Sequence, residues 1–282
     1  MTTQTPEPPV PSQPIARRFV GKVAFITGAA RGQGRAEAVR LAAEGADIIA
    51  LDLCEDIATT TYQGSTPEDL AQTAKLVEAL GRRVVTIQSD TRDFGRMKEG
   101  LDSAVAELGR LDVVIANAGM TTGALSWEID AEHWEVTIGM NLTGAFHTAK
   151  AAIPILLEQG TGGSITFTGS CAGVRGLPFL ADYAAAKHGV VGLSKVLANE
   201  LAPHWIRVNT VHPFGVQSGL MMSEISDLLG EHDVYRPLFM PSLPAYMSQP
   251  EDIAAAVAWI ASDEARHVTG IQLPVDLGRT NR

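Results

Sequence analysis

The stretch TGAARGQG, residues 27–34, decides how this sequence is expected to fold. It follows the apolar run KVAFIT (22–27), which is typical of a buried strand, and precedes RAEAVRLAAEG (35–45), a helical pattern that ends at a glycine. A second apolar run, DIIAL (47–51), then ends at Asp52. Strand, glycine turn, helix and strand in this order predict a βαβ unit.

The same alternation continues to the end of the chain. Further strands are expected at 83–88, 111–116, 164–168, 206–211 and 271–275, and further helices at 67–80, 94–108, 131–158, 181–201 and 251–261. Regular alternation of this kind predicts an α/β fold, a single domain with one doubly wound parallel sheet and helices on both faces.

Three segments stand outside this alternation. Residues 1–18 carry five prolines and are expected to form an extended, poorly ordered tail, so that the domain spans 19–282. An insertion at about 53–66 makes one connection longer than a crossover helix needs. Residues 217–248 are rich in Met, Pro and Leu, and are expected to form an adaptable apolar lid or, alternatively, a subunit contact.

Composition excludes several classes of function. The 282 residues include 22 Lys and Arg against 32 Asp and Glu, a net charge of −10, which disfavours nucleic acid as a partner. No apolar run is long enough for a membrane helix, and the N-terminus has no signal-peptide core. Two distant cysteines and seven histidines show no metal-ligand spacing, so we expect a reduced, cytoplasmic protein without a metal site.

The glycine turn is placed where a dinucleotide would bind. Gly28, Gly32 and Gly34 allow the backbone to turn sharply and approach a pyrophosphate at the next helix N-terminus. Arg31 and Gln33 lie in the same turn and are expected to contact the cofactor. The alternative is a tight turn with a structural role only; the position between a strand and a helix favours dinucleotide binding.

Asp52, with Leu53 beside it, lies at the end of the second strand. A carboxylate there accepts hydrogen bonds from the ribose diol of NAD and repels the additional phosphate of NADP. Arg31 could instead favour that phosphate. We expect NAD, because an unpaired carboxylate against a phosphate costs more than a flexible arginine recovers.

Polar residues follow the next two strands. Asp90 and Thr91 end the third strand, and Asn117, Ala118 and Gly119 follow the fourth. Ligands bind at the carboxyl ends of strands in sheets of this kind, so all five are candidate cofactor contacts. Asn117 could equally serve only to brace the sheet.

Four residues together point to catalysis. Tyr183 and Lys187 are four apart on a predicted helix and share one face. An adjacent ammonium, with a positive nicotinamide ring, would favour the phenolate form of a tyrosine. Ser170, at the end of the fifth strand, could orient a substrate oxygen, and Asn141 is a polar amide inside a long helix, where it is disfavoured without a task.

These motifs resemble the short-chain dehydrogenase/reductase family. The resemblance rests on TGAARGQG, ANAG (116–119), Asn141, Ser170 and YAAAK (183–187), and it covers nearly the whole chain from about residue 19. It implies a Rossmann-type sheet of seven parallel strands and usually a homotetramer. It also implies that Tyr183 exchanges the hydroxyl proton, that Lys187 lowers its pKa and holds the nicotinamide ribose, and that Asn141 positions a water.

Further cofactor contacts are implied by the same resemblance. Val216 matches the position whose backbone meets the carboxamide, with Pro213 before it and Ser218 near the pyrophosphate. Two positions depart from the family: a glycine, Gly169, stands where a paired serine is common, and 212–215 read His-Pro-Phe-Gly rather than Pro-Gly. The first departure leaves the catalytic serine in place, and the second concerns the shape of the loop.

A narrower resemblance links GAARGQGR (28–35), the 53–66 insertion and the VHP segment (211–213) to the mycofactocin-coupled, carveol-dehydrogenase-like subgroup. It implies that the insertion folds over the adenosine half of a tightly held NAD, so that NADH would need a separate redox acceptor. The alternative is a surface insertion that makes no contact with the cofactor.

We therefore expect an enzyme that transfers hydride between NAD and a hydrophobic secondary alcohol, a terpenoid such as carveol, or its ketone. Two alternatives remain at this stage: a ketone reductase that uses NADPH, and a dinucleotide-binding sensor without catalysis.

Overall fold

The computed structural model describes residues 16–218, 223–245 and 247–281. Its strands are β1 (Val23–Thr27), β2 (Asp47–Asp52), β3 (Val84–Gln88), β4 (Val113–Ala116), β5 (Gly163–Thr168), β6 (Ile206–Pro213) and β7 (Gln272–Val275). Its helices are α1 (Gly32–Ala43), α2 (Pro67–Ala79), α3 (Phe94–Leu108), α4 (Ala131–Ile138), α5 (Gly144–Gln159), α6 (Ala181–Leu201), α7 (Ser223–Glu231) and α8 (Pro250–Ala261).

All seven strands form one parallel sheet in the order β3-β2-β1-β4-β5-β6-β7. The chain adds strands toward β3 first and then returns to the other side of β1, so the order reverses between β1 and β4. This confirms the predicted doubly wound sheet, and the reversal marks the place where such sheets bind ligands.

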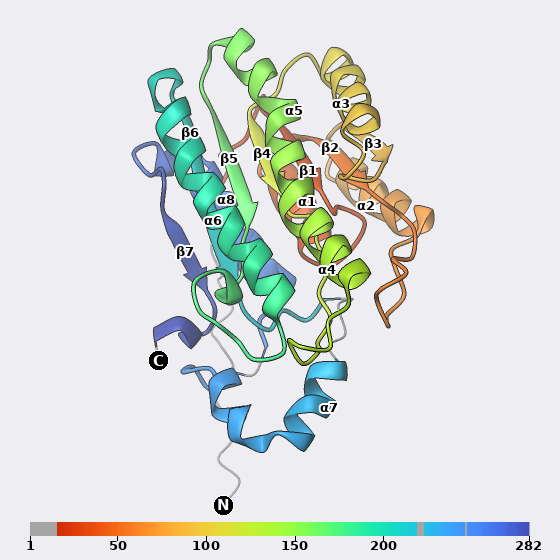
Figure 1. Cartoon of the computed structure of the whole chain (residues 1–282). Helices are drawn as coiled ribbons and strands as arrows, with labels where there is room; N and C mark the ends of the chain where they lie inside the picture. The colour runs from red at the N-terminus through yellow and green to blue at the C-terminus, as the bar shows by residue number, and fades with distance from the viewer. Residues whose placement is uncertain (1–15, 219–222, 246, 282) are drawn as a thin grey trace, which may run out of the picture.

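Helices cover both faces of the sheet, with α5 and α6 in front and α8 behind in the view of Figure 1. On one face α3, α5 and α6 pack through residues such as Leu101, Ala149 and Val190 against Phe25 and Phe167 of the strands. On the other face α1, α2 and α8 pack through Leu41, Val77 and Val257 against alternate residues of the same strands. Strands buried on both sides explain why their sequences read as continuous apolar runs.

The single helix expected at 131–158 is interrupted. Residues Gly139–Thr143 form a π-helical turn between α4 and α5, closed by a hydrogen bond from Gly144 N–H to the Gly139 carbonyl. A π turn inserts one residue into the helical pattern and often marks a functional position. Asn141 lies in this turn.

The described part of 217–248, the segment predicted to form a lid, lies at the carboxyl edge of the sheet. Helix α7 and the 3₁₀ helix Asp233–Phe239 lie below the strand ends in Figure 1. Of the apolar residues on which the lid prediction rested, Leu220, Met221 and Met222 lie outside the described residues. The described rest of the segment lies outside the two helical layers, next to the carboxyl edge of the sheet, where sheets of this kind bind ligands.

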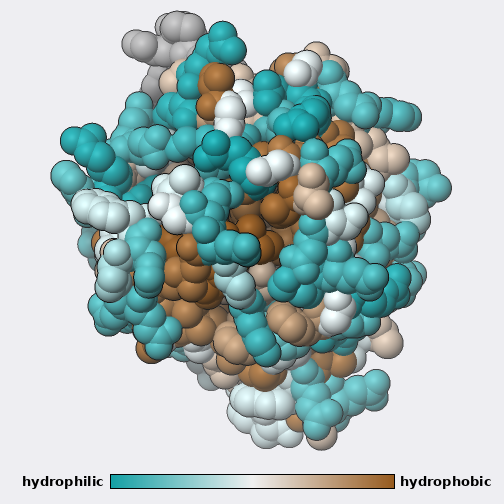
Figure 2. Space-filling model, turned by 90° about the horizontal axis from the view of Figure 1, so that it is seen from above, coloured by the Kyte–Doolittle hydropathy of each residue, from teal (hydrophilic) through white to brown (hydrophobic). Residues whose placement is uncertain are grey.

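The opposite edge of the molecule is mainly hydrophilic. Figure 2 looks down on this edge, where apolar residues gather in the middle of a polar surface.

None of the helices in the described ranges is long and apolar enough to cross a membrane.

One buried charge-bearing group lies in the helix that follows the glycine turn. Glu37 is fully buried in α1, and neither carboxylate oxygen has a hydrogen-bond partner in the part of the chain that the structure describes. Burial without a partner raises the pKa of the Glu37 carboxyl to about 8. The side chain is therefore mostly protonated at neutral pH in the folded chain.

This burial predicts a pH-dependent stability. Between its ordinary pKa near 4.5 and the raised value near 8, the folded chain keeps a proton that the unfolded chain has released. Stability is therefore fully present below about pH 4.5 and is lost as the pH rises toward 8. Between pH 5 and 8 the unfolding free energy of the wild type should fall, and in Glu37→Gln this fall should be smaller by on the order of a few kcal/mol. Urea unfolding at a series of pH values measures the difference.

The matched control is Glu78→Gln, at an exposed position of α2. The unfolding free energy of this variant should fall with rising pH as steeply as that of the wild type. Equal pH slopes for wild type and Glu37→Gln would contradict this account of Glu37.

Candidate active site

Two adjoining cavities open at the carboxyl ends of β1, β4 and β5. The first is lined by the glycine turn, the 53–66 insertion and the strand ends. The second, of about 610 Å³, lies between the segment after β5 and the lid. Gln33, Thr168, Tyr183 and Ser218 line both. Tyr183 therefore stands where the two cavities meet.

The glycine turn forms an anion-binding helix start. Gly28 and Gly32 have positive φ values of 70° and 55°. A Cβ on Gly34 would lie 2.1 Å from the Gly28 carbonyl oxygen, so only glycine fits there. The residue before α1, Arg31, makes no side-chain cap, which leaves the first N–H groups of α1 for a ligand. These features fit a pyrophosphate.

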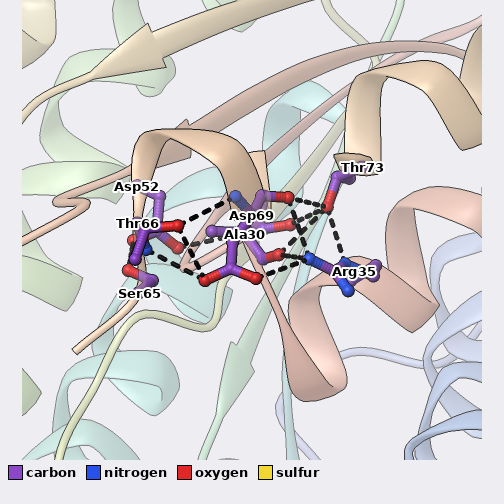
Figure 3. A network of polar contacts seen from close by, with 8 residues as sticks. Ala30, Arg35, Asp52, Ser65, Thr66, Asp69 and Thr73 are labelled. Carbon is purple, nitrogen blue, oxygen red and sulfur yellow. Dashed lines mark hydrogen bonds and ion pairs between the residues drawn. The ribbon is translucent and has the colours of Figure 1, made fainter. Parts of the chain in front are cut away.

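Asp52 is held firmly at the end of β2. One carboxylate oxygen accepts from Ala30 N–H at 2.8 Å, and the other accepts from Cys54 N–H at 3.2 Å and from the Ser65 hydroxyl at 2.5 Å. In Figure 3 the carbonyl of Ala30 in turn accepts from Thr73 and Arg35, and Arg35 also donates to Asp69. The carboxylate thus lines the first cavity in a fixed position.

Arg31, which could have favoured a phosphate on the ribose, is engaged by the insertion. Its guanidinium donates to the carbonyl of Gln63 at 2.7 Å. Arg31 and Leu53 both line the first cavity. Asp52 is thus the fixed charge at the strand end, and the arginine is directed toward the insertion.

The candidates after β3 and β4 separate into two groups. Asn117 donates to the carbonyls of Thr27 and Gly28 and accepts from Thr168, so its side chain braces three strand ends while it lines the cavity with Ala118 and Gly119. Thr91 also lines the first cavity.

Asp90 and Gly34 line neither cavity. Asp90 forms an ion pair with Arg92 at 2.6 Å, and Gly34 provides the space that the Gly28 backbone needs. Pro213 and Val216 line the second cavity only.

Tyr183, Lys187 and Ser170 converge at the junction of the cavities. The Lys187 Nζ lies 5.6 Å from the centre of the Tyr183 ring and donates to the Thr168 carbonyl at 2.8 Å. Ser170 and Tyr183 both line the second cavity, and the Ser170 hydroxyl accepts from Ala172 N–H at 3.1 Å. A serine hydroxyl, a phenol and an ammonium are thereby brought together from β5 and α6.

Burial dominates the electrostatics of this group. It raises the pKa of Tyr183 above its ordinary value, and the hydrogen bond from Ser170 lowers it only in part. Burial also lowers the pKa of the Lys187 ammonium to about 8. The chain by itself therefore keeps the phenol neutral, and Lys187 alone does not produce the lowered Tyr183 pKa that the family resemblance implies.

Asn141 faces the same junction. Its amide nitrogen donates to the carbonyls of Met120 at 2.8 Å and Thr137 at 3.0 Å, while its buried oxygen has no partner within the described chain. Gly119 makes this possible, because a Cβ there would lie 2.6 Å from that oxygen. The free oxygen suits a bound water.

The insertion supplies residues that sequence reasoning did not single out. Tyr62 lines the first cavity, and its hydroxyl accepts from Thr121 N–H at 3.3 Å. The hydroxyl of Thr61 donates to Glu224 of α7. The insertion therefore lines the first cavity and also contacts α7. In the sequence, only the unusual length of this connection pointed to such a role.

The lid forms the apolar wall of the second cavity. Phe239 and Met247 line it from the lid, opposite Leu177 and Leu180. Ile225 of α7 is buried in the same apolar cluster. Among the described residues no group of three His, Cys, Asp or Glu side chains could hold a metal ion.

A family model described as short chain dehydrogenase matches residues 22–228, which include the glycine turn and the Tyr183–Lys187 pair. The chain belongs to the short-chain dehydrogenase family. The predicted family is thus confirmed, and the protein is a short-chain dehydrogenase of the Rossmann type.

The similar proteins include carveol dehydrogenases. The (-)-trans-carveol dehydrogenase of Rhodococcus erythropolis is 43% identical over 273 residues, covering 93% of this chain and 99% of its own. The crystal structure of carveol dehydrogenase from Mycobacterium avium in complex with NAD is 49% identical, with a TM-score of 0.90 and coverages of 94% and 99%.

A short chain dehydrogenase from Mycobacterium paratuberculosis, solved bound to NAD, is 44% identical, with a TM-score of 0.92 and coverages of 94% and 100%. This short-chain dehydrogenase therefore matches both solved relatives over nearly their whole length.

Proposed function

We propose that this short-chain dehydrogenase transfers hydride between NAD and a hydrophobic secondary alcohol, of the terpenoid class that includes carveol, or its ketone. The observation that carries the proposal is the position of Tyr183, which lines both the cavity of the glycine turn and the apolar cavity beneath the lid. A group at this junction can reach a substrate oxygen while a dinucleotide occupies the first cavity.

The residues of the chain have separate tasks in this reaction. When bound, NAD supplies the carbon that accepts or returns the hydride. Ser170 donates a hydrogen bond to the substrate oxygen and orients it, and Tyr183 takes up the hydroxyl proton during oxidation or returns it during reduction. The partnerless oxygen of Asn141 holds a water, through which the proton is passed on.

During oxidation of an alcohol Tyr183 must act as a base, which requires the phenolate form. Without a bound cofactor, the surroundings of Tyr183 disfavour that form. Burial raises the pKa of Tyr183, as described above. The Lys187 ammonium and the positive charge that accompanies the oxidised cofactor both oppose this effect. Proton uptake by Tyr183 is therefore tied to the loaded state of the first cavity.

NAD rather than NADP follows from Asp52. The carboxylate is fixed by three donors at the end of β2, so it is not free to move away from a phosphate on the ribose. Two solved relatives in complex with NAD agree with the cofactor expected from Asp52. The NADPH-dependent reductase is the less favoured alternative.

A dinucleotide-binding sensor is the second alternative. A sensor needs the glycine turn and Asp52, but it has no use for a serine, a phenol and an ammonium gathered at the junction. The apolar wall of the second cavity further supports a hydrophobic substrate.

Asp52→Asn tests the choice of cofactor. The amide keeps an oxygen that can accept from Ala30 N–H but removes the charge that repels a ribose phosphate. The ratio of kcat/KM for NADP to that for NAD should rise by about 10- to 100-fold. Asp90→Asn, at an acid outside both cavities, should leave the ratio unchanged, and a wild type that prefers NADP would refute the role of Asp52.

Tyr183→Phe tests the proton transfer. The variant should lose turnover by about 100-fold or more while NAD still binds, because only the phenolic hydroxyl is removed. Calorimetry with NAD measures binding separately from turnover. Tyr235→Phe, on the lid, serves as the control and should keep wild-type turnover; the same result for Tyr183→Phe would contradict the assignment.

We further propose that the insertion retains the cofactor. Tyr62 hydrogen-bonds the β4–α4 connection and Thr61 hydrogen-bonds α7, so the insertion is held at two separate places. NADH held in this way would pass its electrons to a separate redox acceptor. The proposed assembly is a homotetramer, for which the exposed Phe146 and Leu157 on α5 offer apolar contact surface.

Cofactor retention is measured by denaturing the purified protein and assaying the supernatant for NAD and NADH. The wild type should release near-stoichiometric cofactor, and Tyr62→Phe should retain less after dialysis, because it loses the contact with Thr121. Tyr235→Phe should retain as much as the wild type. A wild type that purifies without cofactor and exchanges it rapidly would rule out retention.

A further inference from the structure

The backbone ladder between β5 and β6 stops just before the catalytic serine. Paired residues end at Thr168 and Val211, with one further hydrogen bond from Gly169 N–H to the Val211 carbonyl at 2.7 Å. Ser170 is the next residue along the chain, and its own backbone is extended. Beyond the ladder some other contact must hold its peptide in place.

The imidazole of His212 lies at this point. His212 belongs to β6 and is fully buried. Its Nδ1 is 2.6 Å from the Ser170 carbonyl oxygen and 3.3 Å from the Ser170 amide nitrogen, and its Nε2 is 2.7 Å from the Thr210 hydroxyl. The side chain thus continues the link between the two strands past the end of the ladder.

These distances select one form of the imidazole. Nδ1 can donate to the Ser170 carbonyl at 2.6 Å or accept from Ser170 N–H at 3.3 Å, but not both at once, and the shorter contact favours a proton on Nδ1. Nε2 is then the acceptor of the Thr210 hydroxyl proton. Burial and the nearby Lys187 ammonium lower the pKa of His212, which is consistent with a neutral ring.

The carbonyl and hydroxyl of Ser170 also accept hydrogen bonds from the backbone that follows. The Ser170 carbonyl accepts from Gly173 N–H at 2.8 Å, and its hydroxyl accepts from Ala172 N–H at 3.1 Å. With the His212 donor, the carbonyl is fixed from both sides, which limits rotation of the peptide that carries the hydroxyl. The direction of the hydroxyl toward Tyr183 depends on that peptide.

The neighbouring glycine matches the ring. A Cβ on Gly169 would lie 2.7 Å from Cε1 and 2.8 Å from Nδ1 of His212. A serine at 169 is therefore incompatible with the ring in this position. The glycine at 169, one of the two departures from the family pattern, therefore has a physical explanation in the ring of His212.

We propose that His212 is a positioning residue of the active site. Its Nδ1–H holds the Ser170 peptide and thereby directs the Ser170 hydroxyl toward the substrate oxygen and Tyr183. This role rests on the proposed dehydrogenase function, because Ser170 has a task only if a substrate oxygen is bound at the junction. His212 itself touches neither of the reacting atoms.

The test compares two substitutions that differ in one donor. Asn at 212 carries a side-chain N–H near the place of Nδ1, whereas Ala carries none. His212→Ala should lower kcat by about 10- to 100-fold with KM for the alcohol little changed, and His212→Asn should stay within about threefold of wild type. NAD affinity, measured by calorimetry, should be the same in both variants.

The same substitution in a Ser170→Ala background separates positioning from general structure. If His212 acts through Ser170, adding His212→Ala to Ser170→Ala should lower kcat by less than about threefold. A loss as large as in the wild-type background would overturn the proposal, and so would an equal loss in His212→Asn and His212→Ala.

A spectroscopic measurement tests the contact without turnover. In the wild type labelled with 15N-histidine, NMR should show His212 as the neutral tautomer with the proton on Nδ1. A proton on Nε2 would overturn the proposed contact. If no secondary alcohol is oxidised, the proposed dehydrogenase function fails, while the tautomer decides the His212 contact independently.

Discussion

The carboxylate of Asp52 joins three parts of the structure that the sequence keeps apart. It closes β2, accepts the backbone of the glycine turn at Ala30 and accepts the Ser65 hydroxyl at the far end of the insertion. Figure 3 shows that this contact leads on to the start of α2 and to Arg35 of α1. The shape of the dinucleotide cavity at the end of β2 therefore depends on this one side chain.

At the other end of the site, desolvation is the strongest influence. Tyr183 and Lys187 are both buried, and burial pushes each of them toward its neutral form. Tyr183 therefore stays neutral in the chain alone, while Lys187, with a pKa of about 8, remains mostly an ammonium at neutral pH. In the proposed reaction, proton uptake by Tyr183 thus depends on what occupies the two cavities.

The alternation of apolar runs and helical patterns was enough to predict the sheet, its seven strands and the site edge, because strand and helix periods are local properties. The sequence left two roles for Asn117, contact with the cofactor or support of the sheet, and the structure shows its side chain hydrogen-bonded to the ends of neighbouring strands. The π turn at Asn141 and the contacts of Tyr62 and His212 were not predictable. Each depends on atoms far apart in the sequence, and residue type does not reveal which partner is reached.

The insertion and the lid interrupt the alternation at separate places in the chain, yet Thr61 and Glu224 connect them. In the proposed function, where the insertion covers the dinucleotide, a bulky substrate that displaces α7 would also pull on that cover.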